Sequence, residues 1–131
     1  MKYKNIIFDF GNVIAGFYEE ELLRLFCECE KDLPVLYDAI YKNWAAVDAG
    51  KIDYYENAKN VEMSVPENLR PTVRKFYREW VALMPPVWQT WQFIRELKKT
   101  GAGIYLLSNA SVILAENTQY YKILELFDGI V

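Results

Sequence analysis

This chain of 131 residues is 53% hydrophobic and 25% charged, with a formal net charge of −3 and no histidine. These values indicate a globular domain with a real core and exclude a disordered segment. The sequence shows no basic stripe, membrane-length apolar run or signal peptide, so we expect no nucleic-acid partner and no membrane span. Without histidine, chemistry must rely on carboxylates, hydroxyls and backbone N–H groups, and the natural candidate for a metal is a hard cation such as Mg²⁺.

The first predicted element is a short strand in which Ile6, Ile7 and Phe8 lead into Asp9. Its continuous apolar run is typical of a parallel-sheet strand buried on both faces. Ligands of open α/β sheets bind at the carboxyl ends of such strands, where a carboxylate can attack phosphorus or hold a cation. Gly11 would let the backbone approach a ligand closely. The alternative interpretation is a buried strand that ends in a turn-forming aspartate.

The middle of the chain predicts a small bundle of four helices joined by short loops. Apolar residues recur at helical spacing in four stretches, which run from Tyr18 to Cys29, Leu36 to Val47, Asp53 to Val61 and Val73 to Met84. Asp53 and Glu56 resemble a capping box at the start of the third helix. We expect the aromatic residues of these stretches to lie mainly in the core rather than to stack on a ligand.

The two cysteines, Cys27 and Cys29, fall within the first of these stretches. Their spacing on a helix points the side chains to different sides, so a disulfide between them is not expected. Such cysteine usage fits a reducing cytoplasm, which is the location we expect.

A second strand ends in polar residues, as the first one does. A predicted helix from Val87 to Lys99, closed by Gly101, precedes the strand Ile104 to Leu107, which leads into Ser108 and Asn109. Asn109 or Ser111 could cap the next helix, expected from Val112 to about Leu126. Ser108 would then stand just before a helix N-terminus, a position that suits an anion. The alternative is that Ser108 and Asn109 form an ordinary helix cap.

These two strand ends resemble the first two motifs of the haloacid dehalogenase (HAD) superfamily. The run Phe8-Asp9-Phe10-Gly11-Asn12-Val13-Ile14 is similar to its sugar-phosphatase-like and epoxide-hydrolase-N-domain-like branch, and Ser108 stands where the second motif has a phosphate-binding hydroxyl. The resemblance implies an α/β fold with an incomplete Rossmann-like parallel-sheet core, residues 1–14 and 86–131, and an inserted four-helix cap, residues 15–85. The turn Asp48 to Asp53 also resembles the small-Gly-x-Ile turn of such caps.

The resemblance further implies a Mg²⁺-dependent phosphatase that acts on a small phosphorylated metabolite through an aspartyl-phosphate. Asp9 would be the nucleophile. The phosphoryl group would be bound by backbone N–H groups of Phe10, Gly11 and Asn12, together with Ser108 and Asn109. The Asp9 carboxylate and the Gly11 carbonyl would contribute to the Mg²⁺ site.

The sequence departs from the family pattern in two places. Gly11 replaces the second aspartate that serves many family phosphatases as general acid–base, and Glu19 and Glu20 are only weak candidates for that role. Leu126 to Val131 reads as the start of a third strand, and no stretch matches the lysine or the paired acids of the later motifs. Lys98 and Lys99 read as solvated charges at a helix end.

From these departures we expect a truncated and poorly active form, with weak or no Mg²⁺ binding. The strand Ile6 to Phe10 would be an exposed sheet edge through which the chain could self-associate. The runner-up hypothesis is a catalytically dead binding module on the same fold. A 2-haloacid dehalogenase, which uses the same kind of aspartate without Mg²⁺, ranks third.

Overall fold

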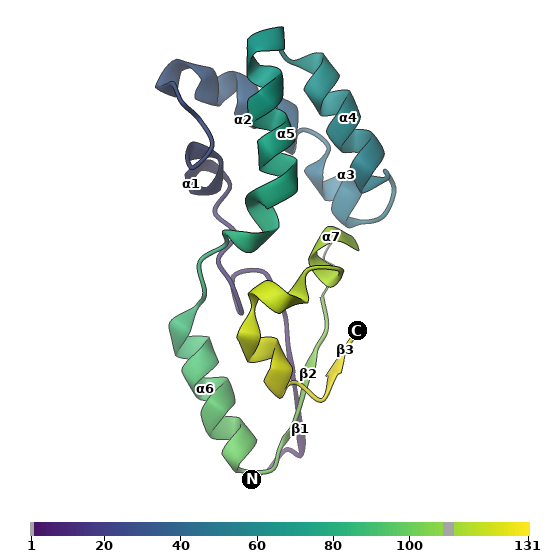
Figure 1. The fold of residues 1–131 in the computed structure, drawn as a ribbon. Helices are drawn as coiled ribbons and strands as arrows, with labels where there is room; N and C mark the ends of the chain where they lie inside the picture. Colours follow the sequence, from purple (N-terminus) through teal and green to yellow (C-terminus); the bar gives the residue numbers. More distant parts are fainter. Residues whose placement is uncertain (1, 109–111) are drawn as a thin grey trace.

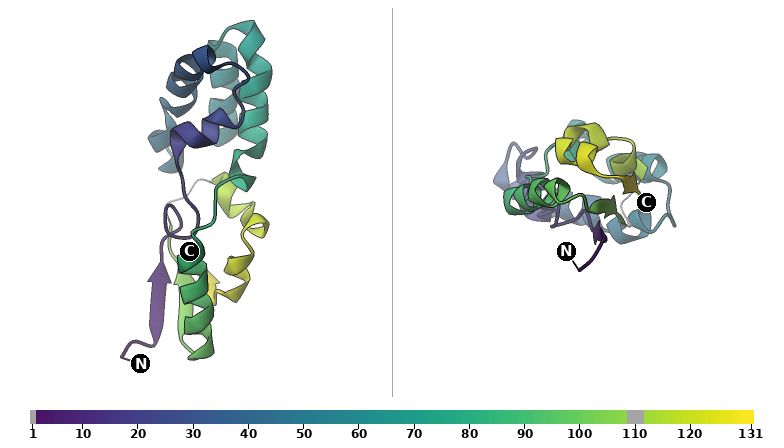
Figure 2. Two further views of the ribbon diagram at one scale, coloured as in Figure 1. Left: turned by 90° about the vertical axis from the view of Figure 1, so that its left-hand side faces the viewer. Right: turned by 90° about the horizontal axis from the view of Figure 1, so that it is seen from below.

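The protein forms two lobes that are stacked along its long axis (Figure 1). A computed structural model describes residues 2–108 and 112–131. The sheet lobe holds the strands, helix α6 and the C-terminal turns. The helical lobe holds helices α1 to α5, whose residues lie between the first two strands in sequence. Both chain connections between the lobes run through the waist of the molecule (Figures 1 and 2).

The described strands form a parallel sheet in the order β1-β2-β3. Strand β1 spans Asn5–Phe8, β2 spans Gly103–Leu106 and β3 spans Gly129–Ile130. Ile6 pairs with Ile104, and Phe8 with Leu106, so the ends of β1 and β2 are level. The prediction of an α/β fold with adjacent parallel strands is confirmed, as is a third strand that starts near the end of this chain.

Only one face of this sheet is covered by the described residues. Phe8, Ile104 and Leu106 are buried beneath α6 (Trp88–Lys99) and the 3₁₀ turn Lys122–Leu126, which lie on the same side of the strands (Figure 2). On the opposite face Ile7 is 64% exposed. The prediction of a strand buried on both faces is therefore wrong for the described chain, because no described element packs against the Ile7 face.

Helix α6 begins and ends close to the predicted residues. Gly101 takes a φ of 79° just after it, as the predicted C-terminal glycine should. Trp88 in its first turn is 62% exposed, whereas Trp91 is buried. Lys98 was expected to be a solvated charge at the helix end, but it forms an ion pair. It pairs with Asp128 at 2.8 Å, and the other oxygen of Asp128 accepts a hydrogen bond from the Ile104 N–H at 2.8 Å, which ties the start of β3 to β2.

The helical lobe differs from the predicted four-helix bundle. Its α-helices are α1 Glu19–Arg24, α2 Leu33–Tyr41, α3 Trp44–Asp48, α4 Tyr54–Ser64 and α5 Arg70–Glu79. The predicted second helix is split into α2 and α3 at Lys42 and Asn43, where Asn43 has non-helical angles (φ −108°, ψ 13°). This break turns the chain so that the Trp44 ring packs on Phe17 and Trp80. The first helix ends at Arg24, well before the predicted Cys29.

Aromatic side chains fill much of the core of the helical lobe, as predicted. Phe76 and Val73 are fully buried. The Tyr54 hydroxyl donates to the Tyr77 carbonyl at 2.8 Å and accepts from Trp80 Nε1 at 2.8 Å. Asp53 caps α4 by accepting a hydrogen bond from the Glu56 N–H at 2.9 Å, which confirms the predicted helix start.

The segment after β2 does not form the single helix predicted from Val112 to Leu126. Helix α7 covers only Val112–Ala115, and the 3₁₀ turns Thr118–Tyr120 and Lys122–Leu126 follow. The Asn117 side chain donates to the Ile113 carbonyl at 2.6 Å, and Asn117 leaves the helical region of φ and ψ. A side chain that bonds the preceding turn in this way competes with helix continuation. The candidate caps Asn109 and Ser111 lie outside the described residues.

Hydrogen bonds around Ile14 hold together the two chain segments that connect the lobes. The Ile14 carbonyl accepts from the Val87 N–H at 3.0 Å and from Trp91 Nε1 at 2.7 Å, and the Gly16 N–H donates to the Pro85 carbonyl at 2.7 Å. These contacts lie near residues 14–15 and 85–86, where the sequence placed the domain boundaries. Across the described residues, no helix has the length and apolar character needed to span a membrane.

Candidate functional site

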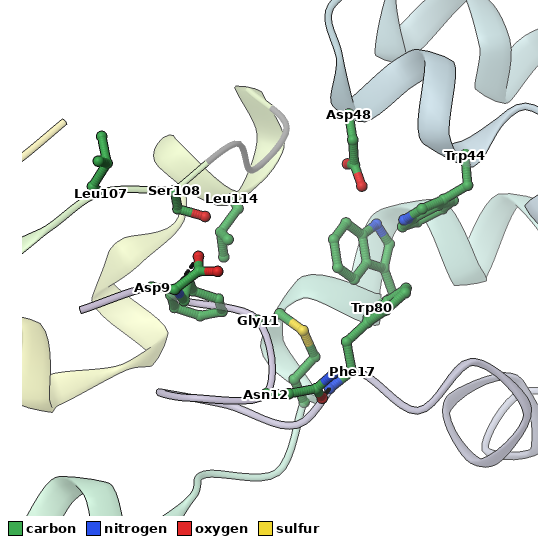
Figure 3. Close-up of a pocket in the computed structure, with 12 residues that line it drawn as sticks. Asp9, Gly11, Asn12, Phe17, Trp44, Asp48, Trp80, Leu107, Ser108 and Leu114 are labelled. Atoms are coloured by element: carbon green, nitrogen blue, oxygen red, sulfur yellow. Dashed lines mark hydrogen bonds between the residues drawn. The ribbon is translucent and has the colours of Figure 1, made fainter.

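A cavity of about 430 Å³ opens between the two lobes (Figure 3). The sheet lobe supplies the polar groups on one side, and the helical lobe supplies aromatic rings and one carboxylate on the other. The residues that line it are Asp9, Phe10, Gly11, Asn12, Phe17, Trp44, Asp48, Trp80, Met84, Leu107, Ser108 and Leu114. The cavity therefore joins residues from both sequence motifs to residues of the helical lobe.

Parallel pairing brings Asp9 and Ser108 together at the carboxyl edge of the sheet. Asp9 directly follows β1, and Ser108 comes two residues after β2. The Leu107 N–H donates to the Phe8 carbonyl at 2.9 Å, so the pairing continues past the strand ends. The side chains of Asp9 and Ser108 lie next to each other at the cavity (Figure 3). This is the juxtaposition that the two strand ends predicted.

The loop after Asp9 is held in place by its own hydrogen bonds. One Asp9 carboxylate oxygen accepts from the Phe10 N–H at 2.7 Å. Asn12 adopts a φ of 59°, its N–H donates to the Ala15 carbonyl at 2.8 Å, and its side-chain oxygen accepts from the Phe17 N–H at 2.8 Å. Asparagine tolerates this left-handed conformation better than most residues. The loop is therefore pre-formed beside the carboxylate.

These bonds limit which of the predicted phosphate donors are open to a ligand. The N–H groups of Phe10 and Asn12 already donate within the loop. Among the described residues, the Gly11 N–H and the Ser108 hydroxyl make no hydrogen bond. Asn109 lies outside the described residues. The structure thus presents one backbone donor and one hydroxyl beside Asp9.

The oxygen atoms near Asp9 suit a hard cation that is shared with a substrate. Asp9 offers a carboxylate, and Gly11, which also lines the cavity, has a backbone carbonyl. The described residues contain no group of three or more carboxylate, cysteine or histidine side chains placed to hold a metal ion. Mg²⁺ commonly binds through one or two carboxylates and completes its shell with water and substrate phosphates. A Mg²⁺ ion held by Asp9 would therefore take most of its ligands from water and from a substrate phosphoryl group.

Asp48 is an ionisable cavity residue that was not predicted from the sequence. It is the last residue of α3, and its side chain reaches into the cavity from the helical lobe (Figure 3). Burial raises the pKa of the Asp48 carboxyl to about 6. Its turn was recognised in the sequence, because Gly50 (φ 73°) follows it, but the sequence did not show where the side chain points.

The two acids suggested from the sequence are engaged elsewhere. The Glu19 carboxylate accepts a hydrogen bond from the Tyr37 hydroxyl, and Glu20 pairs with Arg24 at 2.7 Å. Neither lines the cavity. These two weak candidates for the general acid therefore do not reach the cavity, because their carboxylates bond Tyr37 of α2 and Arg24 of α1.

Three aromatic rings form one wall of the cavity. Phe17 and Trp44 are stacked with ring centroids 5.6 Å apart, and Trp80 meets Trp44 edge to face at 5.0 Å. Met84 and Leu114 extend the apolar lining. The sequence placed Trp44 and Trp80 mainly in the core. Helical spacing identifies the inward face of a helix, but it does not show which inward residues border a cavity.

Neither a scan of protein-family models nor a search of curated proteins finds a match. Solved structures do resemble this one. A structure described as a dehalogenase is 10% identical with a TM-score of 0.65, covering 99% of this chain and 62% of its own. The HAD-hydrolase YfnB from Bacillus subtilis, bound to magnesium, is 17% identical with a TM-score of 0.61, covering 99% of this chain and 65% of its own.

L-2-haloacid dehalogenase from Xanthobacter autotrophicus is 10% identical with a TM-score of 0.59, covering 98% of this chain and 56% of its own. The same enzyme has been solved with chloropropionic acid covalently bound. This chain thus spans 56% to 65% of the length of these proteins. At such low identity the likeness establishes the fold, and on that basis the chain has the fold of the haloacid dehalogenase superfamily hydrolases, as its two strand-end motifs predicted.

Proposed function

We propose that the chain carries the phosphoryl-transfer site of a HAD-type hydrolase, with Asp9 as the nucleophile toward a small phosphorylated metabolite. The observation that carries this proposal is the meeting of Asp9 and Ser108 at one sheet edge, beside the Gly11 N–H and inside one cavity. A carboxylate nucleophile needs hydrogen-bond donors that receive the charge of the transferring group. Both kinds of group are present within this edge.

The hydrogen bond from the Phe10 N–H makes the two carboxylate oxygens of Asp9 different from each other. One oxygen is held by the Phe10 N–H, which orients the carboxylate, and the other faces the cavity as the attacking atom. Attack forms a bond between this oxygen and phosphorus and breaks the bond from phosphorus to the leaving oxygen. The Gly11 N–H and the Ser108 hydroxyl donate to the phosphoryl oxygens. Water then hydrolyses the acyl-phosphate and regenerates Asp9.

The oxygen donors beside Asp9 also support a metal requirement. When bound by the Asp9 carboxylate and the Gly11 carbonyl, Mg²⁺ would supply positive charge against the phosphoryl oxygens. The similar YfnB structure is described as bound to magnesium. Binding by these two groups would be weak without a phosphorylated ligand, because they provide few ligands by themselves.

A second candidate function is favoured by the similar structures. Two of them are described as dehalogenases, and one of these enzymes carries covalently bound chloropropionic acid. The apolar wall formed by Phe17, Trp44 and Leu114 would also accept the carbon skeleton of a haloacid. In that reaction Asp9 would displace a halide from carbon, and no Mg²⁺ would be needed.

Product release under single-turnover conditions tests the proposed function. No stretch of these 131 residues matches the lysine or acid pair of the later family motifs, so we expect slow release and use protein in excess over p-nitrophenyl phosphate. Release of p-nitrophenol should require Mg²⁺ and be lost in Asp9→Asn. The matched control is Asp38→Asn, which changes an exposed aspartate on α2 outside the cavity.

Three other results would each change the conclusion. Chloride release from 2-chloropropionate without Mg²⁺, lost in Asp9→Asn, would establish the dehalogenase candidate. Phosphate binding at Gly11 and Ser108 with no release of either product would establish a binding module. Release that persists in Asp9→Asn would exclude Asp9 as the nucleophile.

A further inference from the structure

We propose that the Asp48 end of the cavity binds a positively charged nitrogen, so that the ligand is a short phosphomonoester that carries an amine or ammonium group. The position of the phosphoryl end rests on the proposed function. The position of the cation rests on Asp48 and the neighbouring aromatic rings alone.

The charges that line the cavity point to a cationic ligand group. Asp9 and Asp48 are the only ionisable side chains in the described lining, and both are acidic. A phosphomonoester brings further negative charge into this space. Like charges in a partly buried site repel each other, whereas a ligand cation beside Asp48 is attracted to that carboxylate.

The aromatic wall strengthens the argument for a cation over other groups. Trp44 and Trp80 lie beside the Asp48 carboxylate, and Phe17 stacks on Trp44 (Figure 3). A cation near the face of an aromatic ring is attracted by the ring's quadrupole, most strongly for tryptophan. A purely apolar group would pack on the rings but would leave the half-buried carboxylate without a partner, which is costly. An ammonium group satisfies both kinds of lining.

Asp48 has no compensating charge within the described residues. Burial is the cause of its raised pKa, and no cation contributes in the opposite direction. The elements packed around it present Asp9 as the other titratable lining group, together with the non-titrating rings of Phe17, Trp44 and Trp80. A ligand ammonium group would supply the missing positive charge.

The shape of the cavity sets the size of the ligand. Asp48 enters from α3, opposite the edge that holds Asp9 and Ser108 (Figure 3). A volume of about 430 Å³ lies at the small end of the range for ligand sites. These features fit a compact ligand with the phosphoryl group at one end and the nitrogen at the other.

Binding of three matched ligands tests this proposal without requiring turnover. Calorimetric titration near pH 8, at constant Mg²⁺, would compare 2-aminoethyl phosphate with propyl phosphate, in which a methyl group replaces the ammonium group, and with 2-hydroxyethyl phosphate. We expect the amine to bind roughly tenfold more tightly than the other two, since a partly desolvated cation–π and carboxylate contact is worth on the order of 1–2 kcal/mol. The preference should vanish in Asp48→Asn and persist in Asp38→Asn.

Equal affinity for the three ligands in the unmodified protein would overturn the proposal. So would a preference for the hydroxyl ligand that depends on Asp48, or an amine preference that survives in Asp48→Asn. Circular dichroism of each variant shows whether it is folded.

A separate probe keeps this test independent of the phosphoryl site. If propyl phosphate and inorganic phosphate leave the Gly11 amide signal in NMR spectra unchanged, the proposed function fails at its phosphoryl end. Tetramethylammonium, which has no phosphate, then tests the cation end by itself. It should shift the indole signals of Trp44 and Trp80 in the unmodified protein but not in Asp48→Asn, and equal shifts in both would overturn the inference.

Discussion

Replacing Asp48 with asparagine should stabilise the protein at neutral and alkaline pH. The carboxyl is half-buried at the end of α3, and burial raises its pKa from the ordinary value of 3.8 to about 6. The folded protein therefore holds this proton more tightly than the unfolded chain does. The cost of the charge is absent below 3.8, grows as pH rises, and is fully present above about 6. Asparagine has a similar shape and carries no charge, so it avoids the cost.

The size of this effect follows from the same pKa. A rise from 3.8 to about 6 corresponds to about 3 kcal/mol at about 1.4 kcal/mol per pH unit. The side chain is only partly buried, so solvent screens the charge. We therefore expect a gain of about 1–2 kcal/mol in the free energy of unfolding at about pH 8, once this screening is allowed for.

Urea denaturation followed by tryptophan fluorescence measures this gain. For Asp48→Asn it should shrink steadily as the pH is lowered from about 6 to about 4, as linkage requires. Asp38→Asn, the exposed control on α2, should change the free energy of unfolding by less than about 0.5 kcal/mol both at about pH 8 and at about pH 4. A loss of stability in Asp48→Asn at pH 8 would show that the carboxylate has a stabilising partner, and a gain that is independent of pH would refute the charge argument.

Substitutions at three further positions test other parts of the fold. Trp91→Phe should lower the free energy of unfolding by about 1–2 kcal/mol in urea titrations, because it leaves the buried Ile14 carbonyl with one donor fewer; an unchanged value would mean that the 2.7 Å bond at the waist contributes nothing. Asp53→Ala should cost about 1 kcal/mol in the same assay through loss of the α4 cap, whereas Asp53→Asn should cost less. Ile7→Lys should reduce self-association in sedimentation runs across a concentration series, since Ile7 is 64% exposed beside the open edge of β1; a monomer at every concentration without the substitution would contradict this edge as a contact surface.

The parts of the fold that could be predicted from sequence are those set by local patterns. Strands β1 and β2 follow from short apolar runs that end in polar residues, and the parallel rule then places Asp9 beside Ser108. The start of α4 follows from the Asp53 and Glu56 spacing, because that cap is a bond between neighbours in the chain.

The rest depends on contacts that no local pattern contains. The exposure of Ile7 depends on which elements cover each face of the sheet, and the break before Trp44 depends on how that ring packs against Phe17 and Trp80. Asp48 follows an ordinary helical stretch in the sequence, and only the stacking of the two lobes turns its side chain toward Asp9.

The most direct test of Asp9 as the nucleophile is the mass of the acid-quenched protein after brief exposure to p-nitrophenyl phosphate and Mg²⁺. We expect the gain of one phosphoryl group, mapped by peptide sequencing to Asp9, removed by hydroxylamine and absent in Asp9→Asn. Product release without any phosphoryl gain on Asp9, or a phosphoryl group on another residue, would contradict it.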